Sequence, residues 1–281
     1  MKSHTIVGRL DILNLVCDSF LVSKNRKIRV WLPSSYSSKS KQKYDVIYMF
    51  DAQNLFDRST SFVEEWEIDE TITYLEKEKH IRPSIVVGLD NSKDRLSEYL
   101  PRFSNIAIGD LAYKGDKTFD FLINQVIPLI ESKYNVNKTK KSRSIGGSSM
   151  GGLMALEAGI KYSNIFNNIY AFSPAFPIYK YGLSEEKPAY LGTNDDSAFN
   201  YVIKQYTSKE LLNKVNIFIT AGGKGIERNY SKYPPNFVNK LIKAGYDSSK
   251  LRYIVDKKYE HNEIMWNEFF YQAYQYFKSL K

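Results

Sequence analysis

Short apolar runs alternate along the chain with longer segments in which apolar residues recur at helical spacing. Eight runs rich in apolar, β-branched and aromatic residues are expected to be strands: residues 12–22, 27–32, 45–50, 84–89, 144–148, 169–172, 215–220 and 251–255. The turn around Lys24 and Asn25 indicates that the first two strands form an antiparallel hairpin. The later runs, such as SIVVGL at residues 84–89, are typical of parallel strands buried on both faces. The pattern therefore predicts an α/β protein with about eight strands in a mostly parallel sheet.

Five segments between these runs have the periodicity of amphipathic helices: residues 64–79, 118–134, 150–162, 236–244 and 264–280. They are expected to cover both faces of the sheet. Pro128 should kink or shorten the second helix, because proline removes a backbone donor. Residues 174–207 break the alternation with Pro, Gly and several Tyr. This stretch predicts an insertion over the carboxyl edge of the sheet, where such folds bind ligands.

Composition narrows the possible functions. The 281 residues contain no stretch that resembles a linker, so residues 1–281 are expected to form a single domain. Cys17 is the only cysteine and there are three histidines, which excludes an intramolecular disulfide and a multi-cysteine or histidine-rich metal site. We expect no metal and no cofactor. The start of the chain does not resemble a secretory signal, and no apolar run is long enough to span a membrane, so a cytoplasmic location without a membrane partner is expected.

The net charge of +9 raises the question of a nucleic-acid partner. The basic residues gather loosely at residues 24–29, 39–43 and 138–143, beside the starts of predicted strands. Solvated turns are expected there, and no nucleic-acid-binding motif accompanies them. We therefore expect no nucleic-acid partner, and we make no prediction of the oligomeric state.

One short motif carries the chemistry. Residues 147–151, GSSMG, match the pattern G-x-S-x-G and lie between a predicted strand and a predicted helix. In that context the glycines permit a sharp turn that raises the serine hydroxyl above the edge of the sheet. Ser149 is the predicted nucleophile, since only this serine has the required glycine spacing. A glycine-rich turn without catalytic function is the alternative.

A serine hydroxyl needs a base to accept its proton, and in this arrangement the order along the chain is Ser, acid, His. His261 is the only histidine after Ser149 and follows the last predicted strand, so it is the predicted base. The acid should lie in the loop after residues 215–220, where Glu227 is the only carboxylate of AGGKGIERN. Asp247 and Asp256 are the other candidates. Glu227 could instead be a surface residue paired with its neighbour Arg228.

Two backbone N–H groups are expected to stabilise a developing oxyanion. The N–H of Met150 lies at the predicted helix start, directly after the nucleophile. The second donor should come from the loop after residues 45–50, and the N–H of Gln53 is the candidate. A plain turn with Asp51 as a helix-capping acid is the alternative for this loop.

Together these residues resemble the putative esterase family of α/β-hydrolases, which includes esterase D, feruloyl esterases, the antigen 85 mycolyltransferases and siderophore trilactone esterases. The similarity runs through most of the chain: YMFDAQNLFD, EEWEIDETI, IVVGLDN with Arg95 and EYLP, FLINQVIPLIESKYNV, GGSSMGGL, AFSPAF and EHNEIMW. It implies the α/β-hydrolase fold, the triad Ser149, Glu227 and His261, and an oxyanion hole from Gln53 and Met150. The chain departs from the family in having Ala52 where glycine is usual, and in the Gly225-Ile226 pair that precedes Glu227.

The residues and the resemblance predict a serine esterase that hydrolyses a small-molecule carboxylic ester through an acyl-enzyme. Phe176 and Tyr179, with other aromatics of the insertion, could form a pocket for an aromatic (feruloyl-like) ester or a siderophore lactone, or could simply pack over the core. Trp66 and Arg95 are further candidate substrate contacts. The alternatives are an acyltransferase with the same triad and a non-catalytic binding protein on the same fold.

Overall fold

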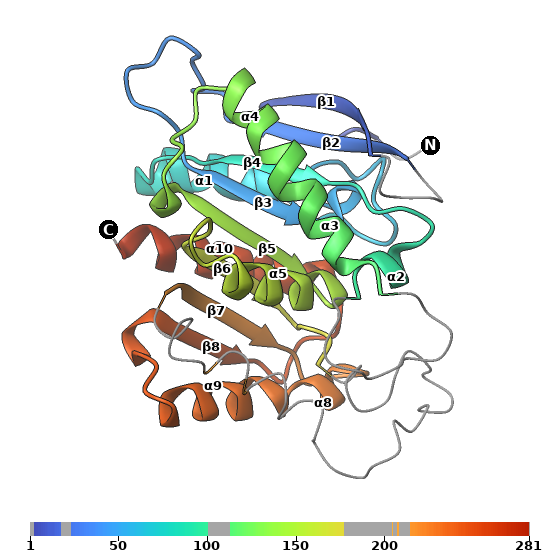
Figure 1. The fold of residues 1–281 in the computed structure, drawn as a ribbon, viewed down its shortest axis with the longest axis vertical. Coiled ribbons are helices and arrows are strands. Elements are labelled where there is room, and N and C mark those ends of the chain that lie inside the picture. Colours follow the sequence, from blue (N-terminus) through green and yellow to red (C-terminus); the bar gives the residue numbers. More distant parts are fainter. Residues whose placement is uncertain are drawn as a thin grey trace.

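The structure is a computed structural model that describes residues 3–17, 24–100, 113–176 and 214–280, with positions 204 and 207. One sheet has the strand order β1-β2-β4-β3-β5-β6-β7-β8 (Figure 1). β2 pairs antiparallel with β1 and with β4, whereas all pairings among β3 to β8 are parallel. The strands are β1 (Arg9–Val16), β2 (Asn25–Leu32), β3 (Val46–Phe50), β4 (Ile85–Leu89), β5 (Arg143–Ser148), β6 (Asn168–Phe172), β7 (Asn216–Ala221) and β8 (Leu251–Val255).

All eight predicted strands are present, and the prediction of a mostly parallel sheet is confirmed. The predicted hairpin of β1 and β2 is also confirmed, although β1 begins three residues earlier than expected, at Arg9. β1 lies at the edge of the sheet, and its side chains are partly buried or exposed along its whole length. An edge strand of this kind needs few apolar residues. The charged residues Arg9 and Asp11 at its start therefore did not indicate a strand.

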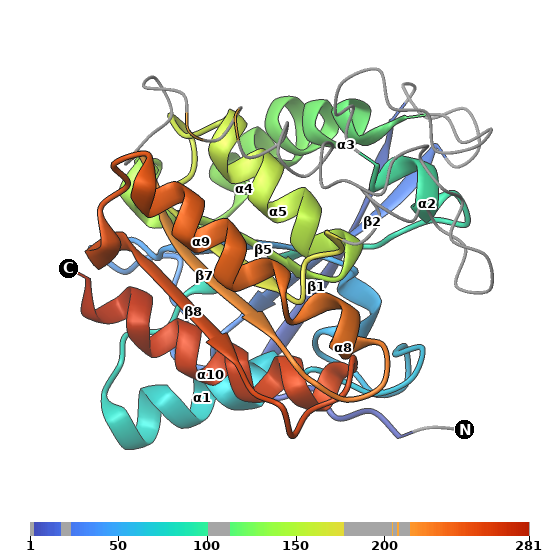
Figure 2. The ribbon, with the colours of Figure 1, turned by 90° about the horizontal axis from the view of Figure 1, so that it is seen from below.

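Helices cover both faces of the sheet (Figure 2). On one face lie α3, α4, α5 and α9, whose apolar residues join one buried cluster. On the other face lie α1 and α10, whose apolar residues join a second cluster. The helices are α1 (Ile68–Lys79), α2 (Arg95–Glu98), α3 (Gly115–Phe121), α4 (Ile127–Lys133), α5 (Met150–Lys161), α8 (Glu227–Tyr230), α9 (Tyr233–Lys243) and α10 (Glu263–Ser279).

The fully buried strand β3 shows how the chain supplies both cores. Val46, Tyr48 and Phe50 belong to the cluster beneath α5, whereas Ile47 and Met49 belong to the cluster beneath α1 and α10. Successive side chains of a strand point to opposite faces, so a strand covered by helices on both sides must be apolar throughout. This explains why its sequence, VIYMF, shows no alternation.

The segment around Pro128 is continuous but not regular. α3 is followed by a π-helical stretch at Leu122–Val126, and α4 begins at Ile127 with Pro128 in its first turn. A proline inside a regular α-helix lacks the N–H donor and its ring collides with the carbonyl four residues earlier. The wider π turn directly before the proline changes the backbone where this collision would occur. The expected irregularity is therefore present, but the two helices continue one another.

α1 begins at Ile68, four residues later than predicted, because the preceding residues are used differently. The N–H of Trp66 donates to the carbonyl of Asn54 at 2.8 Å, and the N–H of Ile68 donates to the carbonyl of Leu55 at 3.2 Å. Glu67, between them, has a left-handed backbone (φ 51°). These bonds fasten the approach to α1 onto the loop after β3. No helix in the described part of the chain combines the length and apolar character that crossing a bilayer requires.

Candidate active site

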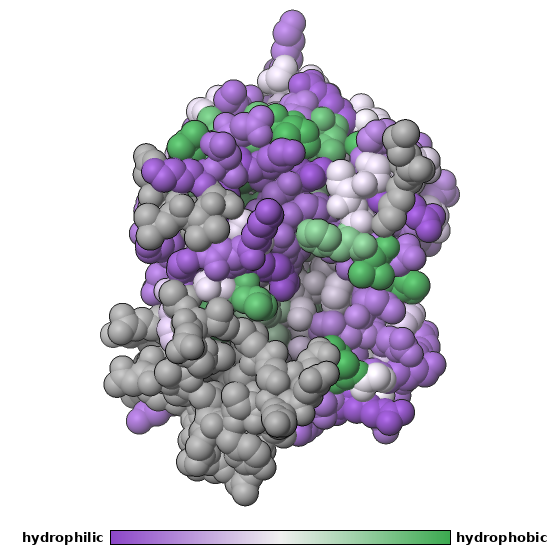
Figure 3. Space-filling view, turned by 90° about the vertical axis from the view of Figure 1, so that its right-hand side faces the viewer, coloured by the Kyte–Doolittle hydropathy of each residue, from purple (hydrophilic) through white to green (hydrophobic). Residues whose placement is uncertain are grey.

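The loops that follow β3, β5, β7 and β8 leave the sheet at one edge, on the right-hand side of Figure 1. Because these strands are parallel, their carboxyl ends meet there, where open α/β sheets bind ligands. Ser149 follows β5, Glu227 follows β7 and His261 follows β8. Figure 3 views this edge, whose described surface is mostly hydrophilic with small, separate hydrophobic patches. The three predicted catalytic side chains therefore come from three loops of one edge.

Ser149 occupies a strained turn between β5 and α5. Its backbone angles, φ 53° and ψ −122°, lie outside the regions that L-residues normally adopt. Its N–H donates to the carbonyl of Phe172 at 2.9 Å, and its carbonyl accepts from Leu153 at 3.1 Å and Ala175 at 3.0 Å. Three backbone hydrogen bonds thus hold an unfavourable conformation that a free turn would abandon. Strain maintained in this way is typical of a functional site.

Gly147 allows the strand and the helix to meet this closely. A Cβ atom at Gly147 would lie 2.6 Å from the carbonyl oxygen of Gly151, a backbone atom that cannot move aside without displacing the helix. The glycine two residues before Ser149 is therefore a steric requirement of the turn. The G-x-S-x-G spacing has the structural context that the sequence predicted for it: a strand, a sharp turn and a helix.

Glu227 and His261 contact each other directly. The Oε1 atom of Glu227 lies 2.6 Å from Nδ1 of His261, and Oε2 accepts from the N–H of Gly222 at 2.8 Å. The side chain of Glu227 is completely buried. The carbonyl of Tyr259 accepts from the N–H groups of Gly223 and Lys224, both at 3.0 Å, so the two loops are also joined through their backbones. A buried carboxylate against Nδ1 leaves Nε2 as the nitrogen available for proton transfer.

The other candidates for the acid lie elsewhere. Asp247 caps the 3-10 turn at residues 248–250 by accepting from the N–H of Ser249, and it is exposed. Asp256 accepts from the N–H of Lys258 and lies 3.5 Å from the ammonium group of that lysine. The burial of Glu227 also contradicts the alternative that it is a surface residue paired with Arg228. Of these three carboxylates, only Glu227 contacts His261.

Aromatic side chains enclose the imidazole of His261. The ring of Tyr230 lies 4.7 Å away between centroids, and the ring of Trp266 lies 5.1 Å away, edge to face. Trp266 packs on Trp66 at 5.4 Å, and Trp66 packs on Phe172, whose backbone is paired with Ser148 at the end of β5. Ring packing therefore runs from His261 to β6, the strand that pairs with β5 next to the nucleophile. Within the described residues, however, the Ser149 hydroxyl and the imidazole are not hydrogen-bonded to each other.

The start of α10 joins the loop of His261 to the loop after β3. Asn262 caps α10 by accepting from the N–H of Met265 at 3.3 Å. The carboxylate of Glu263 accepts from the side chain of Asn54 at 3.1 Å. Burial raises the pKa of Glu263 above its ordinary value, although the nearby imidazole of His261 opposes this shift. The loops that carry the predicted base and the predicted oxyanion donor are thus held together by a buried polar contact.

The two predicted oxyanion donors lie in the first turns of two helical segments, one long and one short. Met150 is the first residue of α5, and N–H groups of a first helical turn have no partner within their own helix. Gln53 lies in the 3-10 turn η1 (Ala52–Asn54) directly after β3. Its carbonyl accepts from the hydroxyl of Thr60 at 2.6 Å, and its side chain exchanges hydrogen bonds with Asn91 at 3.0 and 3.1 Å. These bonds fix the direction of the Gln53 backbone.

The alanine that departs from the family pattern has a complement in the neighbouring strand. A Cβ atom at Gly88, in β4, would lie 2.5 Å from the Cβ atom of Ala52. The methyl group of Ala52 therefore fills the space that the absent side chain of Gly88 leaves. This pairing allows η1 to turn despite the methyl group, so the geometry of the loop depends on both residues.

We predict that Gly88→Ala lowers kcat by about tenfold to a hundredfold, because overpacking displaces η1 and with it the Gln53 N–H. Adding Ala52→Gly should restore most of the lost kcat, since it removes the methyl group that collides. Ester-hydrolysis kinetics of the wild type, both single variants and the double variant measure this. An unchanged kcat in Gly88→Ala, at an unchanged melting temperature, would show that the pairing does not position the loop.

The predicted substrate contacts have different fates. Trp66 is 1% exposed and Phe176 is 0% exposed; Phe176 packs against Tyr233 and Phe237. Their burial places both residues in the core. For Phe176 this is the alternative that the sequence left open, whereas Trp66 was expected only as a substrate contact. Tyr179 lies outside the described residues. Arg95 stays at the site, but its guanidinium is bound to a carboxylate of the protein rather than directed freely at the edge.

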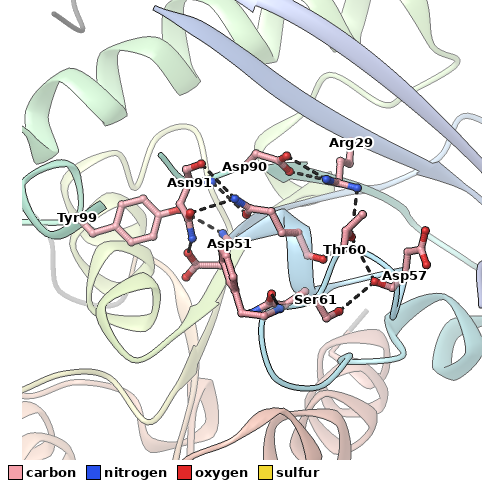
Figure 4. Close-up of polar contacts among 11 residues, drawn as sticks. Arg29, Asp51, Asp57, Thr60, Ser61, Asp90, Asn91 and Tyr99 are labelled. Atoms are coloured by element: carbon pink, nitrogen blue, oxygen red, sulfur yellow. Dashed lines mark hydrogen bonds and ion pairs between the residues drawn. The ribbon is translucent and has the colours of Figure 1, made fainter. Parts of the chain in front are cut away.

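That carboxylate belongs to Asp51, which the sequence suggested only as a capping acid. Asp51 stands at the N-cap position of η1 but makes no side-chain capping bond. Its two oxygens instead accept from Nε and Nη2 of Arg95, at 2.7 and 2.8 Å, and its N–H donates to the hydroxyl of Tyr99 at 3.1 Å. The side chain of Asn91 also donates to it. Figure 4 shows Asp51 with Asn91 and Tyr99 beside it.

One group of acidic side chains in the described chain has the spacing of metal ligands. Carboxylate oxygens of Glu65, Asp69 and Glu70 lie within 4.8 Å of one another. Two of these residues hold the N-terminal segment: Glu65 accepts from the hydroxyl of Thr5 and Asp69 accepts from the N–H of Val7, both at 2.7 Å. Burial, assisted by Glu70, raises the pKa of Asp69 to about 9. Because two of its three carboxylates are already bound to the N-terminal segment, we assign the group to anchoring of that segment.

The raised pKa of Asp69 predicts how stability depends on pH. An acid whose pKa is higher in the folded state stabilises that state below its unfolded pKa, about 4, and this contribution is lost as pH rises toward 9. Asp69→Asn keeps an acceptor for the Val7 N–H and cannot ionise. The variant should therefore gain stability relative to the wild type as pH rises from 5 to 9, by about 1–3 kcal/mol. Urea unfolding at both pH values measures this, and parallel pH profiles would contradict it.

Comparison with known proteins assigns the chain to a family. A sequence model of the family described as "Putative esterase" matches residues 20–266. The "Uncharacterized protein YbbA" of Bacillus subtilis (strain 168) is 29% identical over 160 residues, which are 54% of this chain and 58% of that protein. The "Acetyl esterase" of Caldicellulosiruptor saccharolyticus is 34% identical over 82 residues, 29% of this chain and 31% of that protein. The chain therefore spans less than two thirds of the length of either relative.

Solved structures share the fold over nearly the whole chain. A ferulic acid esterase superposes with a TM-score of 0.69 at 20% identity, covering 97% of this chain and 98% of the other. The siderophore hydrolase EstA from Aspergillus nidulans gives 0.70 at 14% identity, covering 98% and 95%. The enterobactin esterase FES from Shigella flexneri gives 0.67 at 13% identity, covering 98% and 61%. The predicted α/β-hydrolase-like fold is confirmed.

Proposed function

Since the chain belongs to the putative esterase family, we propose that it is a serine esterase with Ser149 as nucleophile, His261 as general base and Glu227 as the acid that orients the base. The observation that carries the proposal is the contact of 2.6 Å between the buried carboxylate of Glu227 and Nδ1 of His261. A buried carboxylate of this kind fixes one tautomer of the imidazole and stabilises its protonated form. The strained backbone of Ser149 at the same edge of the sheet supplies a nucleophile for that base.

The proposed reaction has two steps. Nε2 of His261 accepts the proton of the Ser149 hydroxyl while the oxygen attacks the ester carbonyl carbon, and the carbonyl oxygen becomes an oxyanion. The N–H groups of Gln53 and Met150 donate to this oxyanion, each lowering the barrier by about 3 kcal/mol. When the carbonyl reforms, the alkoxide leaves with the proton of the imidazolium. Water, deprotonated by the same histidine, then hydrolyses the acyl-enzyme and restores the serine.

In the absence of substrate, a hydrogen bond between the nucleophile and the base is not required. Such bonds are often long or poorly aligned in the free enzyme and shorten in the complex. The aromatic residues Tyr230 and Trp266 restrict the imidazole, and the backbone of Ser149 is fixed by three hydrogen bonds. The contact between the Ser149 hydroxyl and Nε2 of His261 is therefore expected to form when the substrate is bound.

For the substrate, we propose a small-molecule carboxylic ester with an aromatic acyl group or a siderophore lactone. The similar structures of a ferulic acid esterase and an enterobactin esterase support this range. Because one relative is an acetyl esterase, a short acyl ester is the substrate to compare with these two. An activated acetate ester, a methyl ferulate and a catechol trilactone therefore form a discriminating panel.

Labelling with a fluorophosphonate tests the proposal before any substrate is known, because only an activated serine reacts quickly. The label should appear on the tryptic peptide of residues 144–161, which contains Ser149. Product analysis of the three esters, with and without a sugar acceptor, should then show the free acid as the product. Transfer of the acyl group to the sugar would indicate an acyltransferase. A chain that neither reacts with the probe nor cleaves any ester would be a binding protein on this fold.

A further inference from the structure

The Asp51 side chain lies between the two segments that carry the proposed oxyanion donors. The backbone carbonyl of Asp51 accepts from the N–H of Asn54 at 3.1 Å. This bond begins η1, which contains Gln53. The Oδ2 atom of Asp51 lies 3.1 Å from the position that a Cβ atom on Gly151 would take, and Gly151 directly follows Met150. The Asp51 residue therefore contacts both segments that carry the proposed donors.

The backbone of Asp51 is also in a costly conformation. It has φ 58° and ψ 48°, the left-handed region that few residues with side chains adopt. This conformation turns the chain sharply from β3 into η1. Groups from one segment hold it: the N–H is bound by Tyr99, and the carboxylate is bound by Arg95 and Asn91. In Figure 4, two of these groups, Asn91 and Tyr99, lie beside Asp51.

The hydrogen bonds of Arg95 are well placed for this task. Nε and Nη2 bind separate oxygens of Asp51, and the guanidinium lies 4.9 Å from the centroid of the Tyr99 ring. Arginine carries its charge at every accessible pH, and its planar group fixes a carboxylate in direction as well as in position. The side chain of Arg95 is 29% exposed, and that of Asp51 is 9% exposed, so solvent screens the pair only in part.

We propose that the ion pair of Asp51 and Arg95 positions the oxyanion hole: it holds the left-handed turn that directs the Gln53 N–H, and it neutralises a carboxylate that would otherwise repel the oxyanion. Arg95 is then a positioning residue that acts through Asp51 rather than a substrate contact. This inference rests on the proposed esterase function and deepens it, because it names a group on which the rate depends without touching the substrate.

Kinetics of Arg95 variants test the inference on the full chain with an activated, uncharged acetate ester. Arg95→Gln leaves the carboxylate unpaired, so kcat should fall by about tenfold to a hundredfold, a part of the effect of losing an oxyanion donor, while KM changes less than threefold. Arg95→Lys keeps the charge but not the two parallel hydrogen bonds, so its kcat should lie between those of the wild type and Arg95→Gln. Asp51→Asn added to Arg95→Gln removes the unpaired charge, and kcat should recover at least fivefold relative to Arg95→Gln.

A transition-state analogue separates positioning from general destabilisation. Affinity for a trifluoromethyl ketone, which forms an oxyanion on the nucleophile, should fall in Arg95→Gln in parallel with kcat. Arg143→Gln is the matched control, because Arg143 makes a similar ion pair with Glu131 at the opposite edge of the sheet. That variant should change the melting temperature but leave kcat and inhibitor affinity within twofold of the wild type.

Two results would overturn the inference while leaving the esterase function intact. One is a kcat in Arg95→Gln equal to that of the wild type. The other is a rise in KM alone that depends on the charge of the ester, which would make Arg95 a substrate contact. If instead the wild type neither cleaves esters nor reacts with a fluorophosphonate, both the function and the inference fail together.

Discussion

Ser149→Ala should lower kcat/KM for any ester that the wild type cleaves by about 10⁴- to 10⁶-fold, because the acyl-enzyme can no longer form. The alanine removes one oxygen and keeps the Cβ atom that the strained turn already accommodates. The three backbone hydrogen bonds of residue 149 do not involve the hydroxyl, so the variant should fold with a melting temperature close to that of the wild type. Labelling by a fluorophosphonate should disappear in the same variant.

Ser148→Ala is the matched control for this experiment. Ser148 is the neighbouring hydroxyl, the last residue of β5, and is 5% exposed. It lacks the glycine spacing, and its backbone belongs to the sheet. We expect kcat/KM within threefold of the wild type and full labelling. If Ser148→Ala abolished labelling and Ser149→Ala did not, the assignment of the nucleophile would be wrong.

The fold could be predicted largely because its central strands are buried on both faces. After their polar first residues, Asp45 and Ser84, the runs 45–50 and 84–89 contain only apolar or aromatic residues and one glycine, and each matches an observed strand, β3 or β4, to within one residue. Helix ends were less predictable. α1 begins late because backbone bonds to residues 54 and 55, more than ten positions earlier, compete with the first helical turn. Periodicity reports which face is apolar, but not which backbone groups are already bound.

The candidate site was partly readable because a nucleophile and its base obey local and ordinal rules. G-x-S-x-G sets a local turn, and His261 was the only histidine beyond it. Glu227 was named from its loop, and the structure places it against that histidine. The ion pair of Asp51 and Arg95 was not predicted, because the partners lie 44 positions apart and no local sequence pattern links them. The burial of Trp66 and Phe176 could not be read from the sequence either. Both are aromatic, as pocket residues often are, and only the packing shows that they lie in the core.

Glu227→Gln should lower kcat by about 10³- to 10⁴-fold, although the substitution changes a single atom. Oε1 of Glu227 contacts Nδ1 of His261 and Oε2 accepts from the N–H of Gly222, so both positions require an acceptor. An amide supplies only one acceptor oxygen. If that oxygen accepts from Gly222, the NH₂ group faces Nδ1 and forces the proton onto Nε2, where the base must be free. If the amide is reversed, two buried donors face each other at Gly222.

The two orientations predict separable consequences. The first inactivates the base and leaves folding nearly intact; the second keeps the tautomer and costs about 1–3 kcal/mol of unfolding free energy for an unsatisfied buried donor. Kinetics and urea unfolding of the same variant distinguish them. Glu260→Gln is the control, since Glu260 adjoins His261 in sequence but is exposed, and it should stay within twofold of the wild type in both measurements. A loss of kcat below tenfold in Glu227→Gln would mean that Ser149 and His261 work without the acid. The aromatic rings around the imidazole, rather than the carboxylate, would then be what orients the base.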